Sequence, residues 1–335
     1  MRVLTVNAGS SSLKLRVVDH DDAGGAEDLG PDADQDAIAT AIASIGPADA
    51  TAHRFVHGGA RFRESVLIEG DVEAGLRELS DLAPLHQATA LHALDIARAA
   101  LPDVPAVACF DTAFHATLPA AAATYAVPRE WGIRRFGFHG LSHAYASRRA
   151  AELLGRPLAE LRIVVCHLGA GASLCAVHAG RSVDTTMGFT PLEGLVMATR
   201  SGSVDPGAVL WLLKHGVATP EELEHALEHE SGLLALAGTA DMRDVLERAA
   251  AGDEDAILAR DVYVHHLRAG IASMAAALGG LEVLVFTGGV GENSPAIRAS
   301  AVEGLAFLGV TEERTLVIPA REDLEMAREA ERVLG

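Results

Sequence analysis

The fold is decided by residues 162–186, which read RIVVCHLGAGASLCAVHAGRSVDTT. Apolar, β-branched runs on either side of a glycine-rich stretch predict a strand, a tight turn and a second strand. The same order occurs near the start of the sequence, where VLTV at 3–6, NAGSSS and LKLRVV at 13–18 follow one another. Two copies of one pattern lead to the hypothesis that the second half repeats the architecture of the first.

Strands and helices alternate through the rest of the sequence. A third apolar run passes into glycines and then into a helix start within LEVLVFTGGVGENS, residues 281–294. Residues 21–36 are rich in Gly, Asp and Ala and predict a surface loop or a short edge element. The other predicted elements are strands within 50–59 and 105–111, helices within 75–101 that break at Pro84, and helices near 37–46, 220–229, 242–251 and 255–278. This interleaving predicts an α/β fold.

Composition limits the possible partners. A length of 335 residues suits two domains, and 49% hydrophobic residues provide packed cores. Lys and Arg total 27 against 46 Asp and Glu, so the net charge of -19 repels nucleic-acid phosphates and anionic lipids. An anionic substrate would therefore need a local cationic pocket. The sequence opens on MRVLTV without a charged leader and has no run of about 18 apolar residues, so we expect a cytoplasmic location.

The glycine-rich turns are candidate phosphate sites, since backbone N–H groups without a neighbouring Cβ can converge on an anion. Neither NAGSSSLK nor HLGAGAS has the GK[ST] ending of a P-loop, and a strand follows each turn where the P-loop needs a helix. GGVGEN lacks the GxGxxG spacing of dinucleotide-binding folds. Three ordinary tight turns remain an alternative at this point.

Two arginines and one aspartate are the candidate ligand-binding side chains. Arg54 lies in HRFVHGG and Arg200 in ATRSGSVDPG, where small neighbours leave room for bidentate contacts to oxygen atoms. Asp111 ends an apolar run, so its carboxylate should emerge at the carboxyl end of a strand, where α/β sheets bind ligands and where magnesium could be held through water. A surface ion pair is the alternative for either arginine.

Other chemistry-bearing residues favour simpler interpretations. His139 and His143 are four apart, which would put them on one helical face like a zinc pair, but no Glu lies in HExxH order and Gly140 weakens the helix. Ser173 in GAGAS does not match the GxSxG motif of serine hydrolases. The cysteines lie in or beside apolar runs without CxxC spacing, which predicts buried reduced thiols at Cys109, Cys166 and Cys175.

Ordered motifs along nearly the entire sequence resemble the acetate kinase family. The motifs are NAGSSSLK (7–14), HRFVHGG (53–59), LAPLHQ (82–87), FDTAFH (110–115), GIRRFGFHGLSH (132–143), CHLGAGAS (166–173), SVDTTMGFTPLEGLVMATRSGSVDP (182–206), SGLLALAG (231–238) with ADMRD (240–244), and VFTGGVGENS (285–294). The stretch at 182–206 is highly specific by itself. The resemblance implies the actin-like ATPase fold, in which two related α/β domains bind nucleotide and substrate in the cleft between them.

The resemblance also implies roles for individual residues. The implied catalytic residues are Arg54, Asp111, His139 and Arg200, and the implied magnesium partners are Asn7, Asp111 and Glu322. The implied phosphate turns contain Asn7, Ser10, Ser12 and Lys14 in the first copy and His167, Gly169 and Gly171 in the second. The implied nucleoside site contains Asp241, Met242, Arg243, Gly289, Val290 and Asn293. The implied acid site contains Arg54, Val56, Leu85, Phe138 and Pro191, with His86 and His143 in supporting positions.

From the same resemblance we expect an N-terminal domain at 1–117, completed by a C-terminal helix at 324–335, and a C-terminal domain at 118–323. The expected activity is reversible, direct in-line transfer of the γ-phosphoryl group of ATP to acetate, giving acetyl phosphate and ADP. A kinase for propionate or another short acid is the alternative, and a non-catalytic nucleotide-binding module of the same fold is a weaker one. The expected cofactor is Mg²⁺, with Mn²⁺ as its substitute, and the expected assembly is a homodimer without nucleic-acid or membrane partners.

The sequence departs from the family pattern at two site positions. Ala170 stands where the family usually has an asparagine beside the phosphates, which removes a hydrogen-bond donor and would weaken phosphate binding or make room for another phosphoryl donor. Leu141 replaces a small hydroxyl residue. The chain is also shorter than usual after Val18, before Gly132 and after Leu308, and these deletions spare every matched position.

Overall fold

A computed structural model describes residues 1–9, 13–19, 22–30, 33–79 and 84–335. The chain divides into two compact units. Unit 1 contains Met1–Ala116, Phe138–Tyr145 and Arg321–Gly335, and unit 2 contains Thr117–Gly137 and Ala146–Ala320. The domain boundaries expected from the sequence stay a prediction, and the division into these units differs from them mainly in assigning Phe138–Tyr145 to unit 1.

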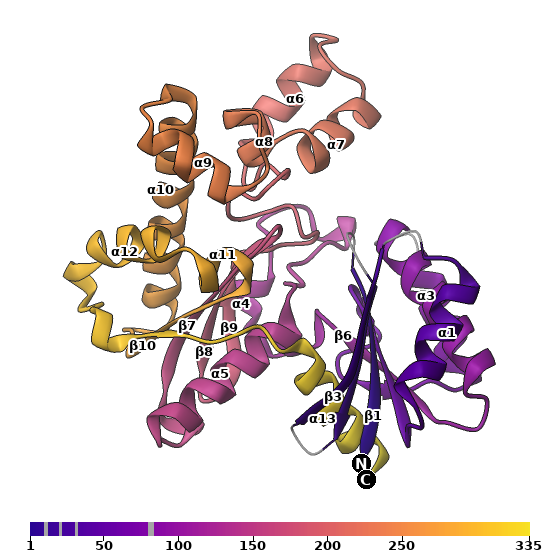
Figure 1. The fold of residues 1–335 in the computed structure, drawn as a ribbon. Coiled ribbons are helices and arrows are strands. Elements are labelled where there is room, and N and C mark those ends of the chain that lie inside the picture. The colour runs from indigo at the N-terminus through magenta and orange to yellow at the C-terminus, as the bar shows by residue number, and fades with distance from the viewer. Residues whose placement is uncertain (10–12, 20–21, 31–32, 80–83) are drawn as a thin grey trace. The chain divides into compact units, whose positions relative to one another are not determined.

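Unit 1 is built on a six-stranded sheet with the order β3-β2-β1-β4-β6-β5 (Figure 1). Its strands are β1 (Arg2–Ala8), β2 (Leu13–Asp19), β3 (Asp22–Leu29), β4 (Ala50–Phe55), β5 (Val66–Leu67) and β6 (Ala106–Phe110). The predicted hairpin is confirmed, because β1 and β2 pair antiparallel from Arg2 opposite Asp19 to Ala8 opposite Leu13. β4 pairs parallel with both β1 and β6, so these three strands end at the same edge of the sheet.

Helices cover both faces of this sheet. Leu4, Val6 and Ala8 of β1 pack into a core with α1 (Gln35–Ile45) and α3 (Pro84–Ala100). Val3 points to the opposite face, as alternation along a strand requires, and packs with α13 (Glu322–Leu334). The predicted helix break is confirmed: α2 (Gly70–Glu78) ends before Pro84, the first residue of α3. A proline is tolerated there because the first helical N–H has no intrahelical partner.

Unit 2 repeats the central pattern in a five-stranded sheet with the order β11-β10-β7-β8-β9. β7 (Arg162–Leu168) and β8 (Ala172–His178) form an antiparallel hairpin around the turn at 169–171, and β10 (Val283–Thr287) pairs parallel with β7. The same relation links β2, β1 and β4 in unit 1. The predicted repetition of the architecture is therefore confirmed at the level of strand pairing.

The remaining elements are mostly helical. They are η2 (Ala113–Thr117), α4 (Ala120–Ala123), η3 (Arg129–Trp131), α5 (Gly140–Leu154), η4 (Leu158–Glu160), β9 (Arg181–Thr185), α6 (Pro206–Lys214), α7 (Pro220–His229), α8 (Gly232–Ala237), α9 (Met242–Ala250), α10 (Glu254–Ala277), α11 (Gly288–Asn293), α12 (Pro295–Glu303), η5 (Ala306–Leu308), η6 (Glu312–Arg314) and β11 (Thr315–Val317). None of the helices in the described ranges is both long and apolar enough to cross a membrane. Cys109, Cys166 and Cys175 are buried thiols that form no disulfide bond in the described part of the chain, as expected.

Candidate functional site

In unit 1, three polar side chains lie at the carboxyl ends of adjacent parallel strands. Asn7 is the penultimate residue of β1, Arg54 that of β4, and Asp111 follows β6 directly. Ligands bind at this edge of α/β sheets because loops leave the strand ends open. Sheet order thus gathers residues that are 47 and 57 positions apart in the sequence.

Arg54 is the centre of this group. Its Nε lies 3.2 and 3.1 Å from Asp111 Oδ1 and Oδ2, and its Nη2 lies 2.6 Å from Oδ2. Nη1 donates to Asn7 Oδ1 at 3.1 Å, and Asn7 Nδ2 donates to Glu322 Oε2 at 2.8 Å. Glu322, the first residue of α13, also lies 4.0 Å from Arg54 Nε. Because two nitrogens of the guanidinium bind one carboxylate, this contact fixes the orientation of the guanidinium plane and holds its positive charge against Asp111.

The electrostatics of this group depend on burial. The side chain of Asp111 is only 1% exposed, and this burial raises the pKa of its carboxyl group while the guanidinium of Arg54 opposes the rise. Burial alone would lower the pKa of Arg54, but the carboxylates of Asp111 and Glu322 raise it above its ordinary value. Arg54 therefore stays positively charged in a largely dehydrated place.

The donor set around Arg54 fits magnesium. Asn7, Asp111 and Glu322 offer amide and carboxylate oxygens, the hard ligands that Mg²⁺ prefers. No group of three or more His, Cys, Asp or Glu within the described part of the chain is arranged to hold a metal ion. Two carboxylates are nonetheless a suitable protein contribution, because protein-bound Mg²⁺ usually keeps waters and substrate phosphates as its other ligands.

His139 adjoins this group through the backbone. It has a φ of 57°, which is unusual for a residue other than glycine, and the N–H of Gly140 donates to the carbonyl of Asp111 at 2.9 Å. A Cβ at Gly140 would overlap that same carbonyl, so only glycine permits this approach. His139 precedes α5, which begins at Gly140, but its ring still lies 6.4 Å from that of His143.

Unit 1 contains a buried set of aromatic rings around Phe138, the residue that precedes His139. His115 Nε2 lies 2.9 Å from the carbonyl of Phe138, and its ring meets that of His143 edge-on at 5.7 Å. Phe138 is 1% exposed and packs edge-on against His57 at 5.5 Å. These contacts support the segment that carries His139. Phe138 and Val56, two residues predicted for the acid site, are both buried in unit 1.

Some predicted residues are exposed or lie outside the described residues. Lys14 is exposed on β2, opposite Asn7 in the hairpin. Ser10 and Ser12 lie outside the described residues, and so do the side chains of Leu85 and His86. Pro191, also predicted for the acid site, belongs to unit 2.

Two buried histidines predict acid sensitivity. Burial lowers the pKa of His53 to about 3 and that of His115 to about 4, so each binds a proton more weakly in the folded than in the unfolded chain. Their contribution to stability is present above a pH of about 6.5 and is lost as the pH falls towards the folded pKa. Each should reduce the free energy of unfolding by about 2 kcal/mol between pH 7 and pH 5.

This prediction can be measured by urea unfolding at both pH values. His53→Gln should be less stable at pH 7 yet lose about 2 kcal/mol less than the wild type on acidification. His92→Gln, an exposed position on α3 of the same unit, is the matched control and should keep the wild-type decline. Equal declines in the two variants would contradict the assignment.

Unit 2 contains a pocket of about 680 Å³ that gathers the predicted nucleoside residues. All six of them, Asp241, Met242, Arg243, Gly289, Val290 and Asn293, line it together with Gly169 and Ala170 of the glycine turn. The remaining lining residues, which sequence reasoning missed, are Ala198, Leu233, Ala240, Leu246, Tyr263, Ser294, Pro295 and Ala296. Most are small or apolar and carry no chemical signal in the sequence. Of the second turn, His167 and Gly171 do not line this pocket.

Polar groups at the pocket are specifically arranged. Asp241 caps α9 and accepts hydrogen bonds from the backbone and side chain of Arg243, and the side-chain bond in particular lowers the pKa of Asp241 to about 2. The hydroxyls of Tyr263 and Ser294 are buried and find no hydrogen-bond partner in the described residues. Volume and a mainly apolar lining with few polar groups are typical of small-molecule sites.

Arg200 lies in the 185–203 loop of unit 2, a segment that begins at Thr185, the last residue of β9, and ends before α6. Its Nη1 donates to the carbonyl of Pro191 at 3.2 Å and lies 3.8 Å from the sulfur of Met197. Both contacts help to orient the guanidinium.

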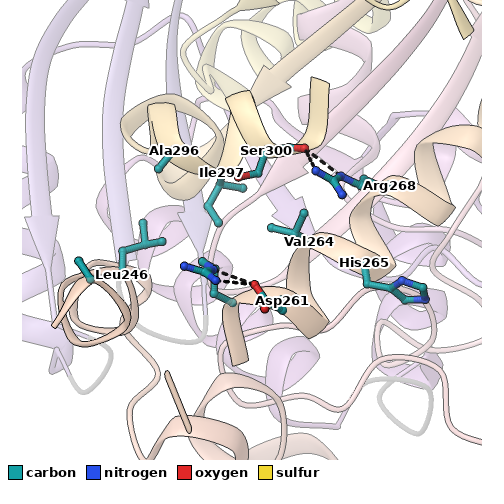
Figure 2. Close-up of a pocket in the computed structure, with 10 residues that line it drawn as sticks. Leu246, Asp261, Val264, His265, Arg268, Ala296, Ile297 and Ser300 are labelled. Atoms are coloured by element: carbon teal, nitrogen blue, oxygen red, sulfur yellow. Dashed lines mark hydrogen bonds and ion pairs between the residues drawn. The ribbon is translucent and has the colours of Figure 1, made fainter. Parts of the chain in front are cut away.

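A second pocket of about 680 Å³ lies among α9, α10 and α12 (Figure 2). Arg268 donates to the carbonyl of Ser300, and Arg260 Nη2 pairs with Asp261 Oδ1 at 2.8 Å. This pocket contains none of the predicted site residues. It shares Leu246 and Ala296 with the pocket that gathers the predicted nucleoside residues, so the two pockets adjoin.

Comparison with known proteins gives a consistent result. The profile of the acetokinase family matches residues 32–327. The acetate kinase of Trichormus variabilis is 50% identical over 299 residues, which cover 88% of this chain and 74% of that protein. The crystal structure of Porphyromonas gingivalis acetate kinase has a TM-score of 0.91 at 32% identity over the full length of both chains, and that of a propionate kinase from Francisella tularensis has 0.90 at 33% identity over 98% of each.

The fold is the actin-like ATPase fold, which a ROK family protein from Streptococcus pneumoniae shares at a TM-score of 0.51 and 14% identity. Fold and relatives together define a phosphotransferase that acts on a carboxyl group. The chain belongs to the acetokinase family.

Proposed function

We propose that the protein transfers the γ-phosphoryl group of ATP to acetate by direct in-line attack, giving acetyl phosphate and ADP. The observation that supports this most is the arrangement of Asn7, Arg54, Asp111 and Glu322, in which one partly buried guanidinium lies against two carboxylates. A module that only bound nucleotide would not need this group. The weaker alternative of a non-catalytic module is therefore disfavoured.

Catalysis in this proposal consists of positioning and charge neutralisation. A carboxylate is already ionised at neutral pH, so the attacking oxygen needs no general base. Arg54, Arg200 and His139 would stabilise the charge that develops on the transferring phosphoryl group. Asn7, Asp111 and Glu322 would hold Mg²⁺, which supplies further neutralisation of phosphate charge when bound.

We propose that the pocket of unit 2 holds the adenosine of ATP. Gly289 lines this pocket, has no protein atom within 4 Å of the position its Cβ would take, and lies close enough to the glycine turn that its N–H is 4.0 Å from a Cβ built on Gly169. The Cβ of a larger side chain at 289 would thus meet open space, and we propose that the rest of the side chain would enter the pocket. Ala170 offers no side-chain donor beside the phosphates, so backbone N–H groups would carry their binding.

Gly289→Leu should raise the KM for ATP by about tenfold or more, since its side chain would occupy ligand space worth at least about 1.4 kcal/mol. Melting temperature should change little. Gly70→Leu, an exposed first-turn glycine of α2 with equally open space, is the matched control and should keep the wild-type KM. If Gly289→Leu kept the wild-type KM for ATP, the proposal that this pocket binds adenosine would be refuted.

The acid is expected to be short because Val56, Phe138 and Pro191 match a small acyl pocket. Propionate is the second candidate, and the similarity to a solved propionate kinase supports keeping it. Incubation with ATP, Mg²⁺, hydroxylamine and acetate, propionate or butyrate would trap each acyl phosphate as a hydroxamate. Acetate should give the highest kcat/KM. Absence of hydroxamate with every acid would refute the proposed function.

Two further expectations belong with this proposal. Members of this family are usually dimers, and we propose a homodimer, to be checked by light scattering. We also propose a cytoplasmic location. We further propose that Mn²⁺ can replace Mg²⁺.

A further inference from the structure

Glu193 is the centre of a polar cluster in unit 2 that the proposed transfer does not use. Arg135 Nη2 donates to Glu193 Oε1 at 2.6 Å, and the hydroxyl of Tyr125 donates to Oε2. The Arg135 guanidinium also lies 5.4 Å from the centre of the Tyr125 ring. Burial, together with the bond to Glu193, raises the pKa of Tyr125 to about 12, so its hydroxyl remains a donor at neutral pH.

The same two side chains bind the backbone of the 185–203 loop. Arg135 Nη1 donates to the carbonyls of Thr185, Thr186 and Met187 at 3.2, 3.1 and 2.9 Å. The Tyr125 hydroxyl accepts the N–H of Phe189 at 3.0 Å. Arg135 and Tyr125 therefore hold the first residues of the loop through hydrogen bonds to the backbone. They hold the middle of the loop through the side chain of Glu193.

Gly188 makes this close packing possible. A Cβ there would overlap both Glu193 Oε2 and the Tyr125 hydroxyl. Its carbonyl also accepts the N–H of Phe136 at 3.0 Å, next to Arg135 in the sequence. The backbone at Gly188 therefore packs directly against the side chains of Tyr125 and Glu193, which distinguishes this cluster from an isolated surface ion pair.

Glu193 is linked to Arg200 by short paths on both sides. Two residues before it, the carbonyl of Pro191 accepts from Arg200 Nη1 at 3.2 Å. Directly after it, Gly194 exchanges two hydrogen bonds with Ser203, its N–H to Oγ at 3.1 Å and its carbonyl from the N–H at 3.0 Å. A fixed Glu193 therefore restrains the carbonyl of Pro191, which orients the guanidinium of Arg200. It also restrains Gly194, which is hydrogen-bonded to Ser203 beyond Arg200.

We propose that Tyr125, Arg135 and Glu193 are positioning residues that hold the 185–203 loop so that Arg200 presents its guanidinium in one orientation. This inference rests on the proposed role of Arg200 in phosphoryl transfer. Displacement of a catalytic group by about 1 Å can cost about 10²-fold in rate, so weakening the cluster should lower kcat. None of the three residues lines the adenosine pocket, so the KM for ATP should be unaffected.

Two conservative variants test the cluster. Tyr125→Phe removes the hydroxyl that joins Glu193 to the loop backbone, and Glu193→Gln removes the charge that holds Arg135. We expect each to lower kcat about tenfold while the KM for ATP stays within a factor of about two. Glu282→Gln is the matched control, because Glu282 pairs with Arg156 and Arg162 in the same unit away from this loop. It should keep the wild-type kcat at a similar melting temperature.

Hydrogen exchange measured by mass spectrometry provides a readout that needs no activity. Exchange at 189–203 should increase in Tyr125→Phe and Glu193→Gln, and exchange in α9 and α10 should not. Unchanged exchange at 189–203, or a kcat equal to that of Glu282→Gln, would overturn the inference. If the wild type itself made no acyl phosphate, the proposed function would fail while the exchange measurement still decided whether the cluster holds the loop.

Discussion

Arg200→Ala should reduce kcat by about 10³-fold or more while the protein remains folded. Arginines that stabilise the charge on a transferring phosphoryl group supply about 10³ to 10⁵ in rate. Arg200 is suited to this because its Nη1 is oriented by the carbonyl of Pro191 and lies 3.8 Å from the sulfur of Met197. Truncation removes the charge and leaves the loop bound through Glu193.

The rate should be measured with saturating ATP, Mg²⁺ and acetate, alongside the circular dichroism spectrum and melting temperature. Arg181→Ala is the control, since Arg181 is an exposed arginine at the start of β9 in the same unit. It should keep wild-type turnover. Retention of more than about a tenth of wild-type turnover in Arg200→Ala would remove Arg200 from the mechanism, because the magnitude would be too small for a residue on the phosphoryl group.

Asp111→Asn should damage both activity and stability. The variant keeps the shape of the side chain but removes the charge that faces Arg54 Nε and Nη2, leaving Glu322 at 4.0 Å as the remaining carboxylate. Removing one partner of a buried ion pair typically costs about 3 to 5 kcal/mol. We therefore expect the free energy of unfolding to fall by about 3 kcal/mol and kcat to fall by about 10³-fold.

The proposed metal role adds a second readout to the same variant. The Mg²⁺ concentration for half-maximal rate should rise, since one of two carboxylates near the proposed ion is lost. Asp71→Asn is the matched control: Asp71 pairs with Arg61 in unit 1 at 3.7 Å, but its side chain is 82% exposed. Such exposed pairs contribute about 0 to 1 kcal/mol, so stability and rate should stay near wild type. If Asp111→Asn and Asp71→Asn lost similar amounts of stability and rate, burial would not explain the effect of Asp111→Asn.

Local sequence predicted much of the fold because the relevant signals act over a few residues. The hairpins at 162–186 and 3–18 follow from apolar runs around small residues, and the helix start at Pro84 follows from the missing N–H of proline. The edge strand β3 was only one of two options, because DAGGAEDL has little strand propensity. It forms since β2 offers a row of backbone groups to pair with.

The candidate site was predicted where a motif carried a chemical signal. Asp241, Met242, Arg243, Gly289, Val290 and Asn293 were assigned by resemblance, and they do line one pocket. Leu233 and Tyr263 of the same pocket have no such signal, because apolar residues in helices are usually core. The cluster of Tyr125, Arg135 and Glu193 was missed for a related reason: 58 residues separate Arg135 from Glu193, and neither stands out among the many charged side chains of the sequence.

By itself, the sequence predicted many of the strands, turns and helices, led to the hypothesis that the architecture repeats, and marked cations beside glycines as the residues to examine. These depend on local geometry and composition. Only the tertiary structure decided that Asn7, Arg54, Asp111 and Glu322 form one bonded group, and that His139 takes a left-handed backbone before α5. The reason is physical: the order of parallel strands and the docking of α13 on them depend on contacts across as many as 315 residues, which no local pattern encodes.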